Sequence, residues 1–142
     1  MAAADGHKNT MEFLRENYQK SEIEIIEIKD SDLKPYSYLD TPQDKFVTLI
    51  QKSLDADLLV LATPVYWYAM SGPMKDFIDR FSDLLSGDQK ELGEALYGKR
   101  IQVLSTGSDS NLPFGFEVPF SATAIYFGMD YMGIVYKSVS NI

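Results

Sequence analysis

Three aromatic rings follow one another in the middle of the chain, in the stretch Val65-Tyr66-Trp67-Tyr68-Ala69-Met70. A connection on the protein surface normally carries polar residues, so apolar groups at this density indicate a ligand or a partner. Flat rings beside free backbone N–H groups suit a planar heterocycle with polar edges. The alternative is that the rings tuck beneath a sheet as a small satellite core.

A polar segment near the amino terminus, Lys8-Asn9-Thr10, is a second candidate site. It precedes residues with the pattern of an amphipathic helix, including Met11 and Leu14. Asn9 or Thr10 is the candidate N-cap, which leaves the first N–H groups of the helix free for an anion, and Lys8 supplies a positive charge. The alternative is an ordinary capped helix without a ligand.

Small residues form a third candidate site, Thr106-Gly107-Ser108, directly after a predicted strand over residues 101–105. Their backbone can approach a ligand closely, because glycine has no Cβ in the way. A plain turn is the alternative, and it applies to Ser108 more than to Thr106 or Gly107.

Few side chains of this sequence could act as catalysts. His7 is the single histidine, which gives little support to a Ser-His-Asp triad and argues against a multi-histidine metal site. The glycine-rich fingerprint of dinucleotide-binding sheets and the Walker phosphate loop are both missing. We therefore predict no catalytic side chain and no metal site, and if the protein is an enzyme a cofactor must carry the reaction.

The elements around the aromatic stretch are predicted to be a strand and a helix. Leu58–Ala62 is a continuous apolar run, typical of a strand covered on both faces, and Thr63-Pro64 is expected to end it. Ser71 and Gly72 are candidate capping residues, and Pro73 fits a first helical turn. The helix then shows an apolar stripe (Met74, Phe77, Ile78, Phe81, Leu84 and Leu85) and a polar side (Lys75, Asp76, Asp79, Arg80 and Asp83). Open α/β sheets bind ligands at the carboxyl ends of such strands.

The remaining elements complete an alternating α/β pattern. We expect an edge strand over 22–28, a helix from Pro42 to about Leu54, a turn of helix over 91–96, a helix over 118–127 that ends at Gly128, and a last strand, also an edge, over 131–136.

Length and composition indicate one domain, residues 1–142, with a hydrophobic fraction of 45%. The net charge of −8 argues against nucleic acid and anionic membrane as partners. The chain contains no cysteine, which excludes disulfides and thiolate chemistry and makes a reducing cytoplasm the expected setting. No apolar run has membrane-spanning length, and the first residues do not read as a signal sequence.

The stretch T-P-V-Y-W-Y-A-M-S-G-P-M-K-D-F-I-D-R, residues 63–80, closely resembles the flavin-binding segment of the NAD(P)H-dependent FMN reductase family. The resemblance implies a flavodoxin-like three-layer sandwich with an open, mainly parallel sheet of strand order 2-1-3-4-5. The domain is expected to be incomplete at both termini. Met1–Ala4 is not expected to form the family's buried first strand, and the usual final helix is missing.

The resemblance also implies a site and a reaction. FMN would lie at the carboxyl ends of the strands, and hydride would pass from NAD(P)H through FMN to a quinone, an azo or nitro compound, or a flavin. A second subunit commonly seals such a site, so a homodimer or higher homo-oligomer is expected. The implied cofactor-binding residues are Lys8, Asn9, Thr10, Pro64, Val65, Tyr66, Trp67, Tyr68, Ser71, Thr106 and Gly107, with Met70 helping to shape the acceptor side.

Other interpretations of the sequence remain open. A flavodoxin-like electron carrier would bind FMN without oxidising NAD(P)H, and the acidic composition suits that function. A flavin-free interaction module is favoured by the expected losses at the termini. A phospho-receiver domain shares the strand order, but it needs an acidic cluster after an apolar first strand, and that cluster is missing here.

Overall fold

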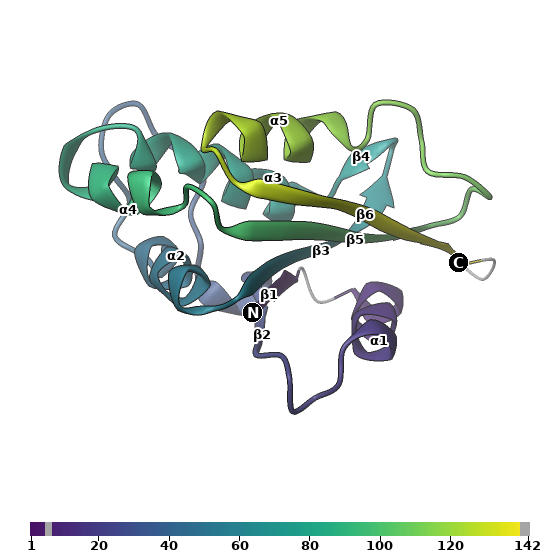
Figure 1. Cartoon of the computed structure of the whole chain (residues 1–142). Coiled ribbons are helices and arrows are strands. Elements are labelled where there is room, and N and C mark those ends of the chain that lie inside the picture. Colours follow the sequence, from purple (N-terminus) through teal and green to yellow (C-terminus); the bar gives the residue numbers. More distant parts are fainter. Residues whose placement is uncertain (5–6, 140–142) are drawn as a thin grey trace.

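A mixed sheet forms the centre of the computed structural model, which describes residues 1–4 and 7–139 (Figure 1). Within these residues, five parallel strands lie in the predicted order, β2-β1-β3-β5-β6. They are β1 (Ala2–Ala4), β2 (Ile25–Glu27), β3 (Leu58–Tyr66), β5 (Arg100–Gly107) and β6 (Asp130–Ser138). A short strand, β4 (Ala69–Met70), pairs antiparallel with the end of β3.

Helices cover both faces of this sheet. They are α1 (Lys8–Asn17), α2 (Phe46–Asp55), α3 (Gly72–Asp79), α4 (Lys90–Ala95) and α5 (Val118–Tyr126), with 3₁₀ turns η1 (Ile28–Ser31), η2 (Arg80–Leu84) and η3 (Gly87–Gln89). Helices α2, α3 and α5 share one apolar core with Leu61 and Val103 of the sheet. Helix α1 packs on the opposite face, against Ala62 and Leu104 (Figure 1). In the described part of the chain, α1 is alone on that face and no helix follows β6.

The prediction that Met1–Ala4 cannot form the first strand is wrong. Ala2, Ala3 and Ala4 are fully buried and pair in parallel with both β2 and β3. The backbone N–H of Ala2 donates to the carbonyl of Glu24 (2.8 Å), and the carbonyl of Met1 accepts from Val60 (2.9 Å). A central strand obtains its hydrogen bonds from two neighbours, so three residues suffice, and methyl side chains leave room for the helices on both faces.

The predicted end of the strand at Thr63-Pro64 is also wrong, because β3 continues to Tyr66. Strand β1 ends opposite Ala62, so from Thr63 onward β3 pairs in parallel with β5 alone. Pro64 lies in register with Thr106 at this position. A residue without an N–H is tolerated there because one side of the strand has lost its partner. The carboxyl end of β3 is therefore still part of the sheet.

Two predicted helix starts are displaced. Helix α1 has His7 as its N-cap, without a side-chain capping bond, so Asn9 and Thr10 lie inside its first turn. Helix α2 starts at Phe46 and not at Pro42. The residues before α2 are held instead by Asp44, whose carboxylate accepts from the N–H groups of Phe46 (3.0 Å) and Lys34 (2.9 Å).

Other predictions are confirmed. Strands β2 and β6 are the two edges, although β2 is shorter than the predicted 22–28. Helix α3 begins directly after Ser71, with Pro73 in its first turn. Helix α5 spans 118–126 and is followed by Gly128 at φ 66°, the left-handed conformation that ends many helices.

The prediction that Arg80 lies on the polar side of the central helix is wrong, because its side chain is buried and only 1% exposed. Its guanidinium donates to both carboxylate oxygens of Asp44, to Asp83 (2.6 Å) and to the carbonyl of Lys34 (2.9 Å). Burial acts to raise the pKa of Asp44, but the hydrogen bonds from Arg80 and from two backbone N–H groups outweigh it and hold the pKa below its ordinary value. Arg80, Asp44 and Asp83, which we call the Arg80 cluster, thus hold the segment before α2 against η2.

Candidate functional site

The aromatic stretch forms a tight β-hairpin at the carboxyl end of β3. Val65 pairs with Met70 and Tyr66 with Ala69, which leaves Trp67 and Tyr68 as the two central residues of the turn. Both have positive φ, 48° and 68°, the combination that a type I′ turn requires. Asn and Gly usually occupy these positions, and holding other residues there costs roughly 1–3 kcal/mol each. Strain of this kind is a reason to look for function at the turn.

The rings of this hairpin face solvent. Tyr66 is 48% exposed, Trp67 92% and Tyr68 65%. The alternative in which they form a satellite core is therefore wrong. The carboxyl end of β3 therefore presents three exposed aromatic side chains.

Ser71 holds the hairpin to the helix that follows. Its hydroxyl accepts from the N–H of Met74 (3.3 Å), and its own N–H donates to the hydroxyl of Thr63 (3.1 Å). Since Ser71 is 1% exposed, it supports the turn from beneath. The partial positive charge of the α3 N-terminus lies at the residues directly after the hairpin.

The amino-terminal candidate residues lie beside the same edge of the sheet. The hydroxyls of Thr10 and Thr106 are 2.9 Å apart, and both residues are buried. The ring of His7 meets that of Tyr66 edge to face, with centroids 6.0 Å apart. Lys8 is exposed in the first turn of α1, and Asn9 is half-buried. The fold thus brings the start of α1 next to the ends of β3 and β5.

Beside the hairpin, a hollow of about 180 Å³ is lined by Val65, Trp67, Tyr68, Ser108, Asp109 and Tyr136. We call it the edge groove. It opens at the carboxyl ends of β3, β5 and β6, where open α/β sheets bind ligands. It is smaller than the roughly 300–1,000 Å³ of typical ligand pockets, so a ligand seated here would remain partly exposed.

The structure separates the predicted site residues by exposure. Lys8, Tyr66, Trp67 and Tyr68 are exposed and Asn9 and Val65 are half-buried, whereas Thr10, Pro64, Ser71, Thr106 and Gly107 are buried. The exposed and half-buried residues are accessible to a ligand from solvent, whereas the side chains of the buried ones are not.

Sequence reasoning missed Asp109 and Tyr136 as groove residues and regarded Ser108 as part of a turn. The hydroxyl of Tyr136 donates to the carbonyl of Asp109 (2.7 Å). Burial raises the pKa of Tyr136, and the charge of Asp109 adds to the effect. The parallel strand order could have signalled Tyr136, since every strand of such a sheet ends at the same edge.

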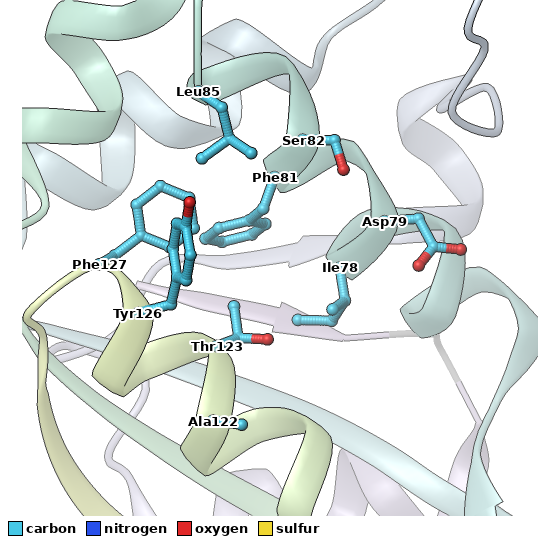
Figure 2. A pocket seen from close by; sticks show the side chains of 9 residues that line it. All are labelled: Ile78, Asp79, Phe81, Ser82, Leu85, Ala122, Thr123, Tyr126 and Phe127. Atoms are coloured by element: carbon cyan, nitrogen blue, oxygen red, sulfur yellow. The ribbon is translucent and has the colours of Figure 1, made fainter.

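A second hollow, of about 370 Å³, lies away from this edge between α3, η2 and α5 (Figure 2). Phe81, Leu85, Tyr126 and Phe127 surround it, and Asp79 is at its rim. Its lining is mainly apolar, which distinguishes it from the edge groove.

Within residues 1–4 and 7–139, no helix has the length and apolar character needed to cross a membrane.

The strand order 2-1-3-4-5 is that of a flavodoxin-like α/β protein, and the aromatic turn lies at its switch-point edge. The Trp repressor binding protein from Bacillus subtilis matches with a TM-score of 0.78 and 23% identity, over 97% of this chain and 83% of that protein. General stress protein 14 from Treponema denticola, solved in complex with FMN, matches with a TM-score of 0.63 and 19% identity, over 99% of this chain and 85% of that one.

The family follows from the sequence comparison. Residues 7–115 match the model of the NADPH-dependent FMN reductase family, and the chain belongs to that family. A relative from Bacillus subtilis (strain 168), provisionally named NAD(P)H-dependent FMN-containing oxidoreductase YwqN, is 31% identical over 96 residues. The match covers 66% of this chain and 53% of YwqN, so the chain spans about half the length of that relative.

Proposed function

We propose that the protein binds FMN at the carboxyl edge of its sheet and catalyses hydride transfer from NAD(P)H to a second small molecule. The observation that carries the proposal is the exposed, strained aromatic hairpin, held between β3 and α3 in a chain of the FMN reductase family. When bound, FMN supplies the redox chemistry that the side chains themselves lack.

The start of α1 suits the phosphate end of FMN. N–H groups in the first turn of a helix attract anions, and Lys8 adds a positive charge to a chain that is otherwise acidic. The Thr10–Thr106 hydrogen bond fixes this turn against the end of β5. In this proposal Lys8 and Asn9 contact the phosphate, and Thr10 and Thr106 position them.

The hairpin and the edge groove suit the ring end of FMN. Backbone groups of residues 64–67 would meet the polar edge of the flavin, and Val65 and Tyr68 would flank its plane. Because the groove encloses only part of a flavin-sized molecule, one flavin face stays open to NAD(P)H and then to the acceptor. The exposed rings of Trp67 and Tyr68 favour a flat acceptor, such as a quinone, an azo or nitro aromatic compound, or a flavin.

We further propose that two copies associate through the apolar hollow of Figure 2. Ile125 and Tyr126 are more than 70% exposed on α5, and the sequence carries no charged residue from Val118 to Phe127. Copies with a net charge of −8 repel one another, and a contact through the uncharged helix α5 adds the least to that repulsion. Helix α5 supplies both an exposed apolar ridge and a wall of the hollow, which suits a two-fold contact.

Purified protein decides between this function and its alternatives. The proposal expects a yellow protein, or one reconstituted by FMN, that oxidises NADH or NADPH when a quinone is present. An electron carrier would bind FMN without oxidising either nucleotide, and a flavin-free module would stay colourless after incubation with FMN. The proposed setting is a reducing cytoplasm, which suits a chain without cysteine.

A further inference from the structure

We propose that Tyr136 is a positioning residue of the flavin site, which fixes the wall of the edge groove formed by Ser108 and Asp109. Gly107 is the residue that makes room for it. This inference rests on the proposed function, because it concerns how the same groove is shaped for FMN.

The path of the Tyr136 side chain supports this role. Tyr136 lies in register with Ser105 in the β5–β6 ladder. Its hydroxyl nevertheless donates to the carbonyl of Asp109, four residues further along the chain, at 2.7 Å. The ring therefore runs along the end of β5 and ties the first residues after that strand to β6.

Gly107 lies under this side chain. A Cβ at residue 107 would stand 2.8 Å from the Tyr136 hydroxyl and 3.1 Å from Cβ of Val65, both closer than ordinary contacts. Gly107 is not among the glycines with positive φ, so its backbone conformation does not require glycine. The requirement is space, and Tyr136 and Val65 use that space.

The anchored wall faces the strained turn. Ser108 and Asp109 line the groove together with Trp67 and Tyr68. Strand β6 continues the support, since the N–H of Val139 donates to the carbonyl of Gly107 (2.8 Å). The Tyr136 hydroxyl is protonated at neutral pH, as that of an ordinary tyrosine is, and burial raises its pKa further, so it can donate to Asp109.

The test compares Tyr136→Phe with Tyr131→Phe. Tyr131 lies on the same strand, and its hydroxyl donates to Glu117 (2.9 Å) outside the groove, so Tyr131→Phe removes a similar bond without touching the wall. Trp67 is the single tryptophan and lines the groove, so its emission reports the wall in the apo protein. Tyr136→Phe is expected to change the Trp67 emission and to raise the Kd for FMN roughly three- to tenfold, and Tyr131→Phe to change neither.

Gly107→Ala disturbs the same contact from its other side. It is expected to push the Tyr136 hydroxyl off Asp109 and to weaken FMN binding as Tyr136→Phe does. The double variant should lose less FMN affinity than the two single losses combined, because both substitutions break the same contact. Full additivity would overturn the inference, as would Tyr136→Phe with wild-type Trp67 emission and wild-type Kd. If the wild type itself fails to bind FMN, the proposed function is wrong, and the Trp67 emission of the apo variants alone decides whether Tyr136 positions the wall.

Discussion

The aromatic hairpin and the Arg80 cluster (Arg80, Asp44 and Asp83) lie at opposite ends of α3. Each places side chains in the environment that their polarity disfavours: the cluster buries charged groups, and the hairpin exposes aromatic rings. Arg80, Asp44 and Asp83 are charged and buried, but each is matched with ionic or hydrogen-bond partners. Tyr66, Trp67 and Tyr68 are aromatic and face solvent, and the turn that presents them is strained. The cluster stabilises the fold, whereas the hairpin keeps a surface open, which is the difference expected between a structural and a ligand-binding region.

The largest effect should come from removing the charge at the centre of the cluster. Arg80→Ala leaves two buried carboxylates without their partner, and we expect the free energy of unfolding to fall by roughly 3–5 kcal/mol. Denaturant unfolding measures it. Lys75→Ala is the matched control, because it removes an exposed ion pair with Asp79 that is worth no more than about 1 kcal/mol. If the two variants lose the same free energy of unfolding, the buried Arg80 cluster stabilises the fold no more than an exposed ion pair does.

The second effect concerns pH. The pKa of Asp44 is lowered in the folded state, so its contribution to stability is present above the unfolded-state pKa of 3.8 and is lost as pH falls through the lower, folded-state pKa. Asp44→Asn should be less stable at pH 7 and should show a shallower loss of stability below pH 4. Urea unfolding from pH 6 to 2 measures both. If the free energy of unfolding falls as steeply with pH in Asp44→Asn as in the wild type, Asp44 does not cause the loss of stability in acid.

A smaller effect, of opposite sign, is expected at the hairpin. Tyr68 has a positive φ, which glycine adopts without strain. Tyr68→Gly should therefore raise the free energy of unfolding by about 1 kcal/mol, and it should weaken FMN binding because it removes a ring of the hairpin. Tyr38→Gly is the control, since Tyr38 is also exposed but is not among the residues with positive φ. Thermal melts and FMN titration measure the two properties. Loss of stability in Tyr68→Gly would mean that the turn carries no strain.

The smallest effect on folding is expected on the exposed side of α5, next to the apolar hollow. Ile125→Glu changes an exposed residue, so stability should stay within about 0.5 kcal/mol of the wild type. Its effect should appear in assembly, as a shift from dimer to monomer in analytical ultracentrifugation. Leu39→Glu adds the same charge at a residue that is 95% exposed and outside the hollow, and it should leave the dimer intact. If both variants stay dimeric, the exposed side of α5 is not part of the interface.

Local patterns predicted much of this fold. The apolar run before the aromatic stretch becomes β3, Ser71 caps α3, and Gly128 follows α5. The failures depend on contacts distant in sequence. Three alanines form a central strand because β2 and β3 supply their hydrogen bonds, and Arg80 is buried because Asp44 lies 36 residues away on a segment that folds against it.

The site was predictable to the same degree. Its exposed rings, and the approach of α1 to the ends of β3 and β5, follow from residue types and parallel topology. The I′ geometry at Trp67 and Tyr68 did not follow, because neither residue favours positive φ. Tyr136 was missed because its contact with Asp109 depends on the register of β6 and on the space above Gly107.

FMN binding at the hairpin can be followed by titrating the protein with FMN and recording the emission of Trp67. Trp67 lies in the edge groove and is the single tryptophan. We expect saturable quenching with one FMN per chain, and bleaching of the bound flavin absorbance when NADH or NADPH is added without oxygen. If the emission shows no saturable change and the protein stays colourless after gel filtration, FMN does not bind at the hairpin.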